Sequence, residues 1–171
     1  MASSVQNLSI GTISKNADCS KFKIAIVVAE WNADITESLF TGAKEALIQS
    51  GVREKNIIRT NVPGSFELTL GCQWMASNLK VDAVIALGCV VMGDTPHFDY
   101  ICQSVSYGIT ELNIKFNKPI IFGVLTTLNQ QQALDRAGGK HGNKGHEAAI
   151  TALKMLLVWK GKLVKKGWAL A

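Results

Sequence analysis

The chain has 171 residues, 47% of them hydrophobic and 18% charged, and its formal net charge is +5. This length fits one domain with a buried core, and since no apolar run approaches about 18 residues, no membrane span or membrane partner is expected. The first residues lack a basic region followed by an apolar core, so no signal peptide is expected either.

Strand and helix patterns alternate along residues 21–160, which we expect to form the domain. Four short apolar segments predict strands, over residues 21–30, 56–61, 82–91 and 120–125. Helical patterns follow them, over about residues 34–50, 66–79, 98–116, 130–137 and 143–160. Asn32 or Asp34 is placed to cap the first helix. Residues 1–20 are expected to form an N-terminal arm, and residues 161–171 a basic tail.

This alternation predicts an α/β fold, a three-layer αβα sandwich with a four-stranded, mostly parallel, flavodoxin-like sheet. The arm is a candidate to extend that sheet, from or to a neighbouring subunit. With strand order 2-1-3-4, the order reverses between the first and third strands, and open sheets bind ligands beside such a point. The loops that follow these two strands are therefore expected to form the site.

The third strand leads into the segment that carries the most chemistry. Gly88 and Gly93 bracket its end, and Asp94, Thr95 and His97 follow in the turn before a helix. Backbone N–H groups in such a turn suit an anion, and a histidine there exchanges protons near neutral pH. The pattern also fits an ordinary strand–helix turn with a solvated histidine.

Two other loops bring candidate ligand contacts to the same edge. Trp31 directly follows the first strand, where it either covers the core or forms a stacking platform for a flat heterocycle. Glu67, near the start of the second helix, either favours the helix dipole or accepts hydrogen bonds from ligand hydroxyls. The turn over residues 63–67 would close one side of the site.

Basic residues in the last third of the chain also allow two interpretations. Arg136 is either a solvated side chain or a bidentate phosphate clamp. Lys144 lies at a helix start, where the dipole disfavours a cation, so a bound anion would explain it. The lysines within residues 160–166 fit a solvated end of the chain. No nucleic-acid motif accompanies them, so no nucleic-acid partner is expected.

Missing patterns exclude other chemistry. His141 and His146 lack a carboxylate partner in register, so no metal site is expected. No glycine-rich nucleotide motif and no nucleophile elbow occur, which argues against nucleotide binding and acyl transfer. The four cysteines lack metal-type spacing and three lie in apolar segments, which indicates a cytoplasmic protein.

Four motifs occur in a specific order and spacing. They are VPGSFE (62–67), ALGCV with GDTPHFDY (86–90, 93–100), PIIFGVLTT (119–127), and RAGGK with GNKG (136–140, 142–145). Over residues 22–159 the sequence resembles the 6,7-dimethyl-8-ribityllumazine synthase family. The resemblance implies a transferase of riboflavin biosynthesis that condenses 5-amino-6-ribitylamino-2,4-pyrimidinedione with 3,4-dihydroxy-2-butanone 4-phosphate, releasing phosphate and water. It implies no metal and no cofactor.

The resemblance also implies roles for particular residues. His97 matches the family's proton-transfer histidine, and Trp31 stands where the family usually has Phe. The pyrimidine and its ribityl chain would contact Trp31, Ser65, Phe66, Glu67, Cys89, Val90, Val91 and, from a neighbouring subunit, Phe122. The phosphate would contact Asp94, Thr95, Arg136 and, as a further candidate, Lys144.

An oligomer follows from the same resemblance. The family assembles as pentamers, and in many members twelve pentamers form a hollow icosahedral shell. The link over residues 138–143 has no insertion, as in shell-forming members, which favours a homopentamer assembled to a 60-mer, with a functional link to riboflavin synthase. The alternative is a flavin-binding or shell-forming homologue without catalysis. The presence of the family's functional residues argues against this alternative, since His97, Thr95 and Arg136 all match the family motifs.

Overall fold

The computed structural model describes residues 13, 17–78 and 80–161, and within them a sheet of four parallel strands forms the centre. The strands are β1 (Ile24–Ala29), β2 (Ile57–Val62), β3 (Ala83–Val91) and β4 (Ile120–Thr127). They are hydrogen-bonded in the order β2-β1-β3-β4. The predicted α/β class and strand order are therefore confirmed. The predictions for the arm and the basic tail lie almost entirely outside the described residues.

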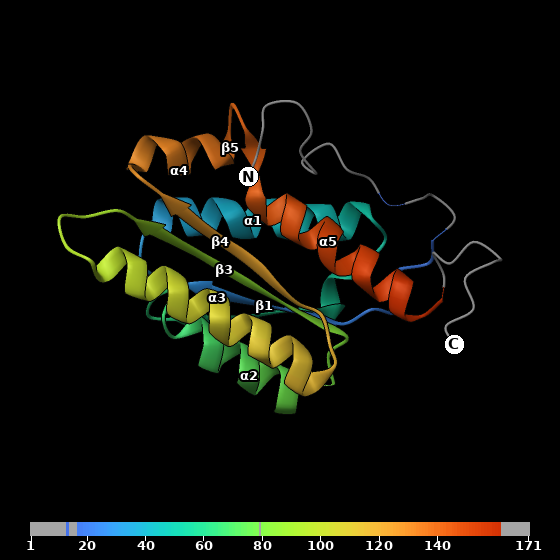
Figure 1. The fold of residues 1–171 in the computed structure, drawn as a ribbon. Helices are drawn as coiled ribbons and strands as arrows, with labels where there is room; N and C mark the ends of the chain where they lie inside the picture. The colour runs from blue at the N-terminus through green and yellow to red at the C-terminus, as the bar shows by residue number, and fades with distance from the viewer. Residues whose placement is uncertain (1–12, 14–16, 79, 162–171) are drawn as a thin grey trace.

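Helices cover both faces of this sheet (Figure 1). One face packs against α1 (Ala33–Gln49) and α5 (Lys144–Trp159), and the other against α2 (Leu68–Asn78) and α3 (His97–Phe116). The shorter elements are a 3₁₀ turn before β2, η2 (Glu54–Asn56), and a helix after β4, α4 (Gln130–Arg136). None of the helices within the described ranges combines the length and hydropathy that a transmembrane segment requires.

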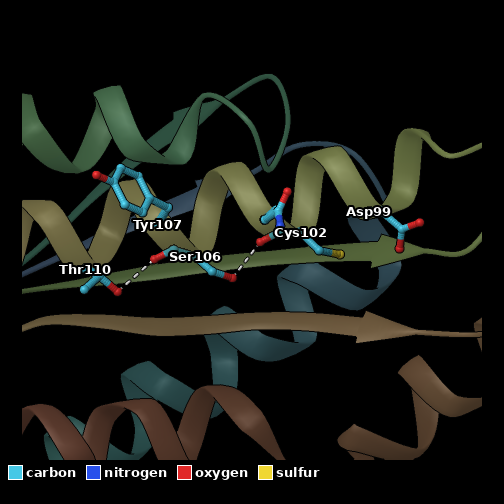
Figure 2. A pocket seen from close by; sticks show the side chains of 6 residues that line it. Asp99, Cys102, Ser106, Tyr107 and Thr110 are labelled. Carbon is cyan, nitrogen blue, oxygen red and sulfur yellow. Dashed lines mark hydrogen bonds between the residues drawn. The ribbon is translucent and has the colours of Figure 1, made fainter.

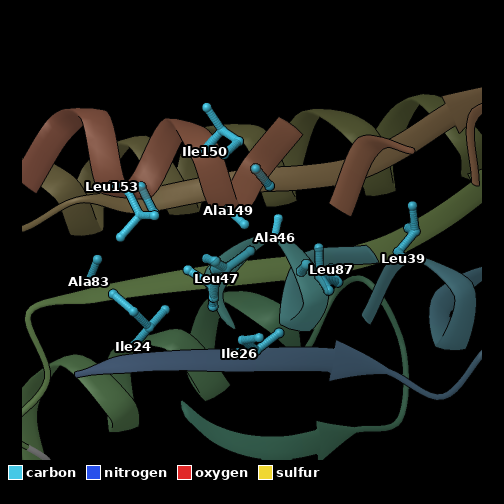
Figure 3. Packing of buried hydrophobic residues seen from close by; sticks show 14 of the residues in the cluster. Ile24, Ile26, Leu39, Ala46, Leu47, Ala83, Leu87, Ala149, Ile150 and Leu153 are labelled. Atoms are coloured by element: carbon cyan, nitrogen blue, oxygen red, sulfur yellow. The ribbon is translucent and has the colours of Figure 1, made fainter. Parts of the chain in front are cut away.

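Alternate residues of β1 enter two separate cores. Ile24 and Ile26 pack towards α1 and α5, whereas Ala25 and Val27 pack towards α2 and α3. Figure 3 shows the first of these cores, where side chains from the two helices meet those of the sheet. Every residue of β1 is buried. An unbroken apolar run is what a strand covered on both faces requires.

The fourth strand is longer than its apolar run predicts. It continues past Leu125, because β3 still offers backbone partners: Val90 pairs with Thr126, and Val91 with Thr127. The predicted end of this strand at residue 125 is therefore wrong. Backbone pairing extends a strand into polar residues that a hydropathy pattern leaves out.

A small antiparallel hairpin joins α4 to α5, where the sequence pattern predicts no strand. Its strands are β5 (Ala137–Gly139) and β6 (Gly142–Asn143). Gly138 and Gly142 adopt φ angles of 112° and 79°, which glycine accepts without steric cost. The Asn143 side chain then caps α5, accepting hydrogen bonds from two backbone N–H groups of its first turn.

Candidate active site

A cleft of about 760 Å³ opens where the loops after β1, β2 and β3 meet. Its lining comes from segments far apart in the sequence: Trp31, Asn32, residues 63–67, residues 89–91, His97 and Ile101. The cleft lies at the carboxyl ends of β1 and β3, the neighbouring strands at which the strand order reverses. This is the place at which the topology predicts a ligand site.

The first wall of the cleft is the loop after β1. Backbone hydrogen bonds tie this loop to the turn after β2: Glu30 N donates to Val62 O at 2.9 Å and Trp31 N to Pro63 O at 3.1 Å. The Trp31 side chain is 73% exposed. It therefore does not cover the core, which leaves the interpretation of a stacking platform.

The second wall is the turn that leads into α2. Phe66 and Glu67 are exposed there, whereas Ser65 is buried. The Ser65 hydroxyl has no hydrogen-bond partner among the described residues. Gly88 makes room for it, because a Cβ at that position would lie 2.7 Å from Ser65 Oγ. A buried hydroxyl without a partner costs free energy, and a ligand hydroxyl would recover it.

The third wall is the end of β3, formed by Cys89, Val90 and Val91. Burial raises the pKa of the Cys89 thiol to about 11. The thiol is therefore protonated at neutral pH and presents an apolar surface rather than a nucleophile. Together with the two valines it gives the cleft an apolar side, which suits the edge of a flat heterocycle.

His97 lines the cleft as the first residue of α3. Its side chain makes no hydrogen bond with any other described residue, and it is exposed. Asp94 and Thr95 are also exposed, in the turn just before it, but they do not line the cleft of this chain. The histidine is therefore placed to exchange protons with a ligand, and no hydrogen bond to another described residue indicates a role in stabilising the fold.

Besides Asp94 and Thr95, three more predicted site residues lie outside the cleft of their own chain, as far as the structure describes it. Phe122, in the middle of β4, is 38% exposed. Arg136 ends α4, and its Nη1 donates to Gln132 O at 3.4 Å. Lys144 begins α5 and forms an ion pair with Glu147 in the same helical turn. That pair gives the lysine charge a partner, so a bound anion is not needed to explain it.

The guanidinium of Arg136 keeps most of its donors available. The neighbouring carboxylate, Asp135, is instead engaged by Gln131 and by Lys140, each at 3.0 Å. Hydrogen bonds from these two side chains hold the pKa of the Asp135 carboxyl below its usual value. Within the described residues, Arg136 is thus not paired with an acid, which leaves its fork of donors for an anion.

Asn32 lines the cleft and occupies the N-cap position of α1, the place predicted for it or for Asp34. Its side chain does not act as the cap, however. Asn32 adopts φ 60° and ψ 49°, and its side chain makes no capping hydrogen bond to the described part of α1. Instead, its Nδ2 donates to Cys89 O at 3.0 Å. An asparagine in the short loop after a buried strand is the available signal, since asparagine tolerates the left-handed conformation better than most residues.

A second depression, of about 730 Å³, lies along the outer face of α3 (Figure 2). Its lining residues come from this helix: Asp99, Cys102, Gln103, Ser106, Tyr107 and Thr110. The hydroxyls of Ser106 and Thr110 are engaged with backbone carbonyls one helical turn earlier. This depression does not join loops from different strands, so it is not the candidate active site.

The fold and the first cleft define an open α/β protein that binds a small molecule at the carboxyl edge of its sheet. A family model described as 6,7-dimethyl-8-ribityllumazine synthase matches residues 21–160. The chain belongs to this 6,7-dimethyl-8-ribityllumazine synthase family. The resemblance drawn from the four motifs is confirmed, and so is the prediction of an enzyme, a transferase of riboflavin biosynthesis.

Curated relatives agree over most of the chain. The 6,7-dimethyl-8-ribityllumazine synthase of Cytophaga hutchinsonii is 70% identical over 131 residues, which are 77% of this chain and 82% of that protein. Its counterpart in Parabacteroides distasonis is 56% identical over 91% of this chain and 98% of that protein. The one in Christiangramia forsetii is 48% identical over 98% of this chain and 100% of that protein.

Proposed function

We propose that the chain condenses 5-amino-6-ribitylamino-2,4-pyrimidinedione with 3,4-dihydroxy-2-butanone 4-phosphate to 6,7-dimethyl-8-ribityllumazine. One observation carries the proposal: eight predicted site residues from four segments of the chain line one cleft, namely Trp31, Ser65, Phe66, Glu67, Cys89, Val90, Val91 and His97. The alternative, a homologue without catalysis, is not favoured, because relatives at up to 70% identity carry the synthase name.

The pyrimidine is proposed to lie between Trp31 and the end of β3. The exposed indole of Trp31 stacks on the ring, and Val90 and Val91 cover its edge. The Ser65 hydroxyl and the Glu67 carboxylate offer hydrogen bonds to the ribityl hydroxyls. These contacts hold the attacking amine in one place, and such positioning supplies a large part of the rate enhancement for two bound reactants.

The reaction requires several proton transfers, which we assign to His97. The primary amine attacks the ketone carbon, and loss of water from the adduct gives an imine. A proton then leaves C3 as the C4–O bond to phosphate breaks, and the resulting enol tautomerises to a carbonyl at C3. Ring closure by the ribitylamino nitrogen onto this new carbonyl releases another water. An exposed imidazole that lines the cleft is placed to remove a proton from the amine and to return protons to the departing water.

The phosphate of the second substrate is proposed to bind at the N-terminus of α3, beside Asp94 and Thr95. Backbone N–H groups and the helix dipole favour an anion there. Arg136 would clamp the phosphate, with Lys144 as a further contact. Since Arg136 and Phe122 do not line the cleft of their own chain, we propose that a neighbouring subunit supplies them.

A shared site of this kind requires an oligomer. We propose a homopentamer, assembled to an icosahedral 60-mer, with the partly exposed Phe122 buried against the neighbouring cleft. A location in the cytoplasm and a functional link to riboflavin synthase remain predictions. No nucleic acid or membrane is proposed as a partner, and no metal or cofactor is assigned to the reaction.

Incubation of the purified chain with both substrates tests the proposed activity. We expect the fluorescent lumazine and inorganic phosphate to form in equal amounts, faster than in the same mixture without protein. Omission of either substrate is the control, and both signals should then be absent. A rate equal to the reaction without protein would contradict the proposal.

We also expect riboflavin to bind in this cleft and to compete with the pyrimidine, because both carry a ribityl chain on a flat ring. Stacking contributes about 0.5–1.5 kcal/mol beyond burial, so the larger indole of Trp31 should give a few-fold gain over a phenyl ring. Riboflavin titrations of the wild type and of Trp31→Phe, followed by tryptophan fluorescence, measure this gain. Trp74 and Trp159 lie on α2 and α5 and should respond little. Equal affinity and equal quenching in both proteins would remove Trp31 from flavin binding.

A further inference from the structure

We propose that Asn32 is a positioning residue, whose side-chain amide fixes the Trp31 loop to the end of β3 and thereby sets the distance between two walls of the pyrimidine site. This inference rests on the proposed function of the cleft. It assigns Asn32 no contact with a reacting atom. The residue acts through the two walls that it joins.

Asn32 continues the pairing of β1 with β3 beyond the point where β1 ends. The parallel ladder between these strands stops at Val28 and Leu87, yet β3 runs on to Val91. At the level of Cys89, β1 has ended and no longer supplies a backbone N–H group to β3. The Asn32 amide takes that place, since its Nδ2 donates to Cys89 O at 3.0 Å. The amide thus supplies a hydrogen bond that the strand cannot.

The left-handed backbone at Asn32 makes this contact possible. Its φ of 60° and ψ of 49° differ from those of the helix that follows, and side chains other than asparagine, aspartate and glycine are strained there. The preceding N–H group, that of Trp31, donates in the other direction, to Pro63 O at 3.1 Å. Two consecutive residues therefore join all three walls of the cleft.

Loss of the amide should affect the two substrates differently. The pyrimidine is proposed to lie between Trp31 and the end of β3, which are the two segments that the amide connects. The phosphate is proposed to bind the turn before α3 and the guanidinium of Arg136, which the amide does not touch. A positioning role therefore predicts weaker binding of the pyrimidine and unchanged binding of butanone phosphate.

The test is Asn32→Gly, which keeps the left-handed backbone and removes the amide. We expect the KM for the pyrimidine to rise about tenfold, because the two walls that hold the ring lose the hydrogen bond between them. The KM for butanone phosphate should change less than about twofold, since its phosphate contacts are intact. Asn32→Asp should raise the pyrimidine KM at least as much, because a carboxylate oxygen would replace the donor.

Asn117→Gly is the matched control. Asn117 follows the end of α3. In the described ranges it is the second non-glycine residue, after Asn32, that has a positive φ, at 45°. It is not among the residues that line the cleft. The same substitution there should leave both KM values and the assembly unchanged. A shift of the pyrimidine KM in Asn117→Gly as large as in Asn32→Gly would overturn the proposal.

Trp31→Ala separates a failure of this inference from a failure of the proposed site. If Trp31→Ala weakens the pyrimidine but Asn32→Gly and Asn32→Asp do not, the positioning role is wrong and the site stands. If none of the three variants changes the pyrimidine KM, both are wrong. An equal rise of both KM values in Asn32→Gly would indicate a general loss of structure and would also overturn the positioning role.

Discussion

Replacement of His97 by alanine should slow the condensation by roughly 10- to 10⁴-fold, the range expected when a general acid–base group is lost. Folding and assembly should not change, because the exposed imidazole makes no hydrogen bond with another described residue. The measurement is kcat at saturating concentrations of both substrates, together with a sizing column. Some activity should remain, since the two substrates also condense slowly without a catalyst.

Added imidazole provides the control for His97→Ala. His97 is exposed, so a small base can enter the space left by its side chain and partly restore the rate. A variant that folds, assembles and turns over like the wild type would remove His97 from the mechanism. A variant that is slow but cannot be restored by imidazole would point to positioning rather than proton transfer.

Arg136→Ala should raise the KM for butanone phosphate by about 10²-fold, because hydrogen bonds to a charged group contribute about 1.5–3 kcal/mol each. The KM for the pyrimidine should change far less. Arg136→Lys should have a KM for butanone phosphate between those of the wild type and Arg136→Ala, since it keeps the charge and loses the fork of donors. Initial rates with each substrate varied in turn give both values. Equal loss for both substrates would contradict the phosphate clamp.

Mixed assemblies of the two inactive variants show whether the clamp comes from a neighbour. If His97 of one subunit and Arg136 of the next form one site, chains of His97→Ala and Arg136→Ala should together rebuild complete sites. Random mixing in equal amounts in a ring should make about a quarter of the sites complete. Failure to regain activity after dissociation and reassembly would place both residues in the same subunit.

The parts of the fold that follow from burial could be predicted from the sequence. The apolar runs of β1 and β3 identify strands covered on both faces, and the alternation with helices limits the strand order to few choices. That order brings the loops after β1 and β3 together, so the place of the cleft follows from topology. The individual roles of Phe66 and His97 came from the family resemblance, because a strand–helix turn alone fits a solvated histidine equally well.

Features that depend on contacts between distant residues could not be predicted in this way. The amide of Asn32 reaches a carbonyl 57 positions away, and only the three-dimensional fold shows that β1 has ended there. The hairpin at residues 137–143 depends on backbone pairing between short, glycine-rich segments that carry no alternating pattern. Lys144 is a different case. Its partner Glu147 is three residues further on, a spacing at which helical side chains meet.

The buried thiol of Cys89 has a consequence for chemical selectivity. Butanone phosphate is an electrophilic ketone, and a thiolate beside it would compete with the pyrimidine amine for the carbonyl carbon. With its pKa raised to about 11, the thiol is ionised in only about one molecule in 10⁴ at pH 7. The protein thus places sulfur next to the reactants in a form that does not compete for the ketone. We expect peptide mass spectrometry to find no adduct of butanone phosphate on Cys89 after prolonged turnover.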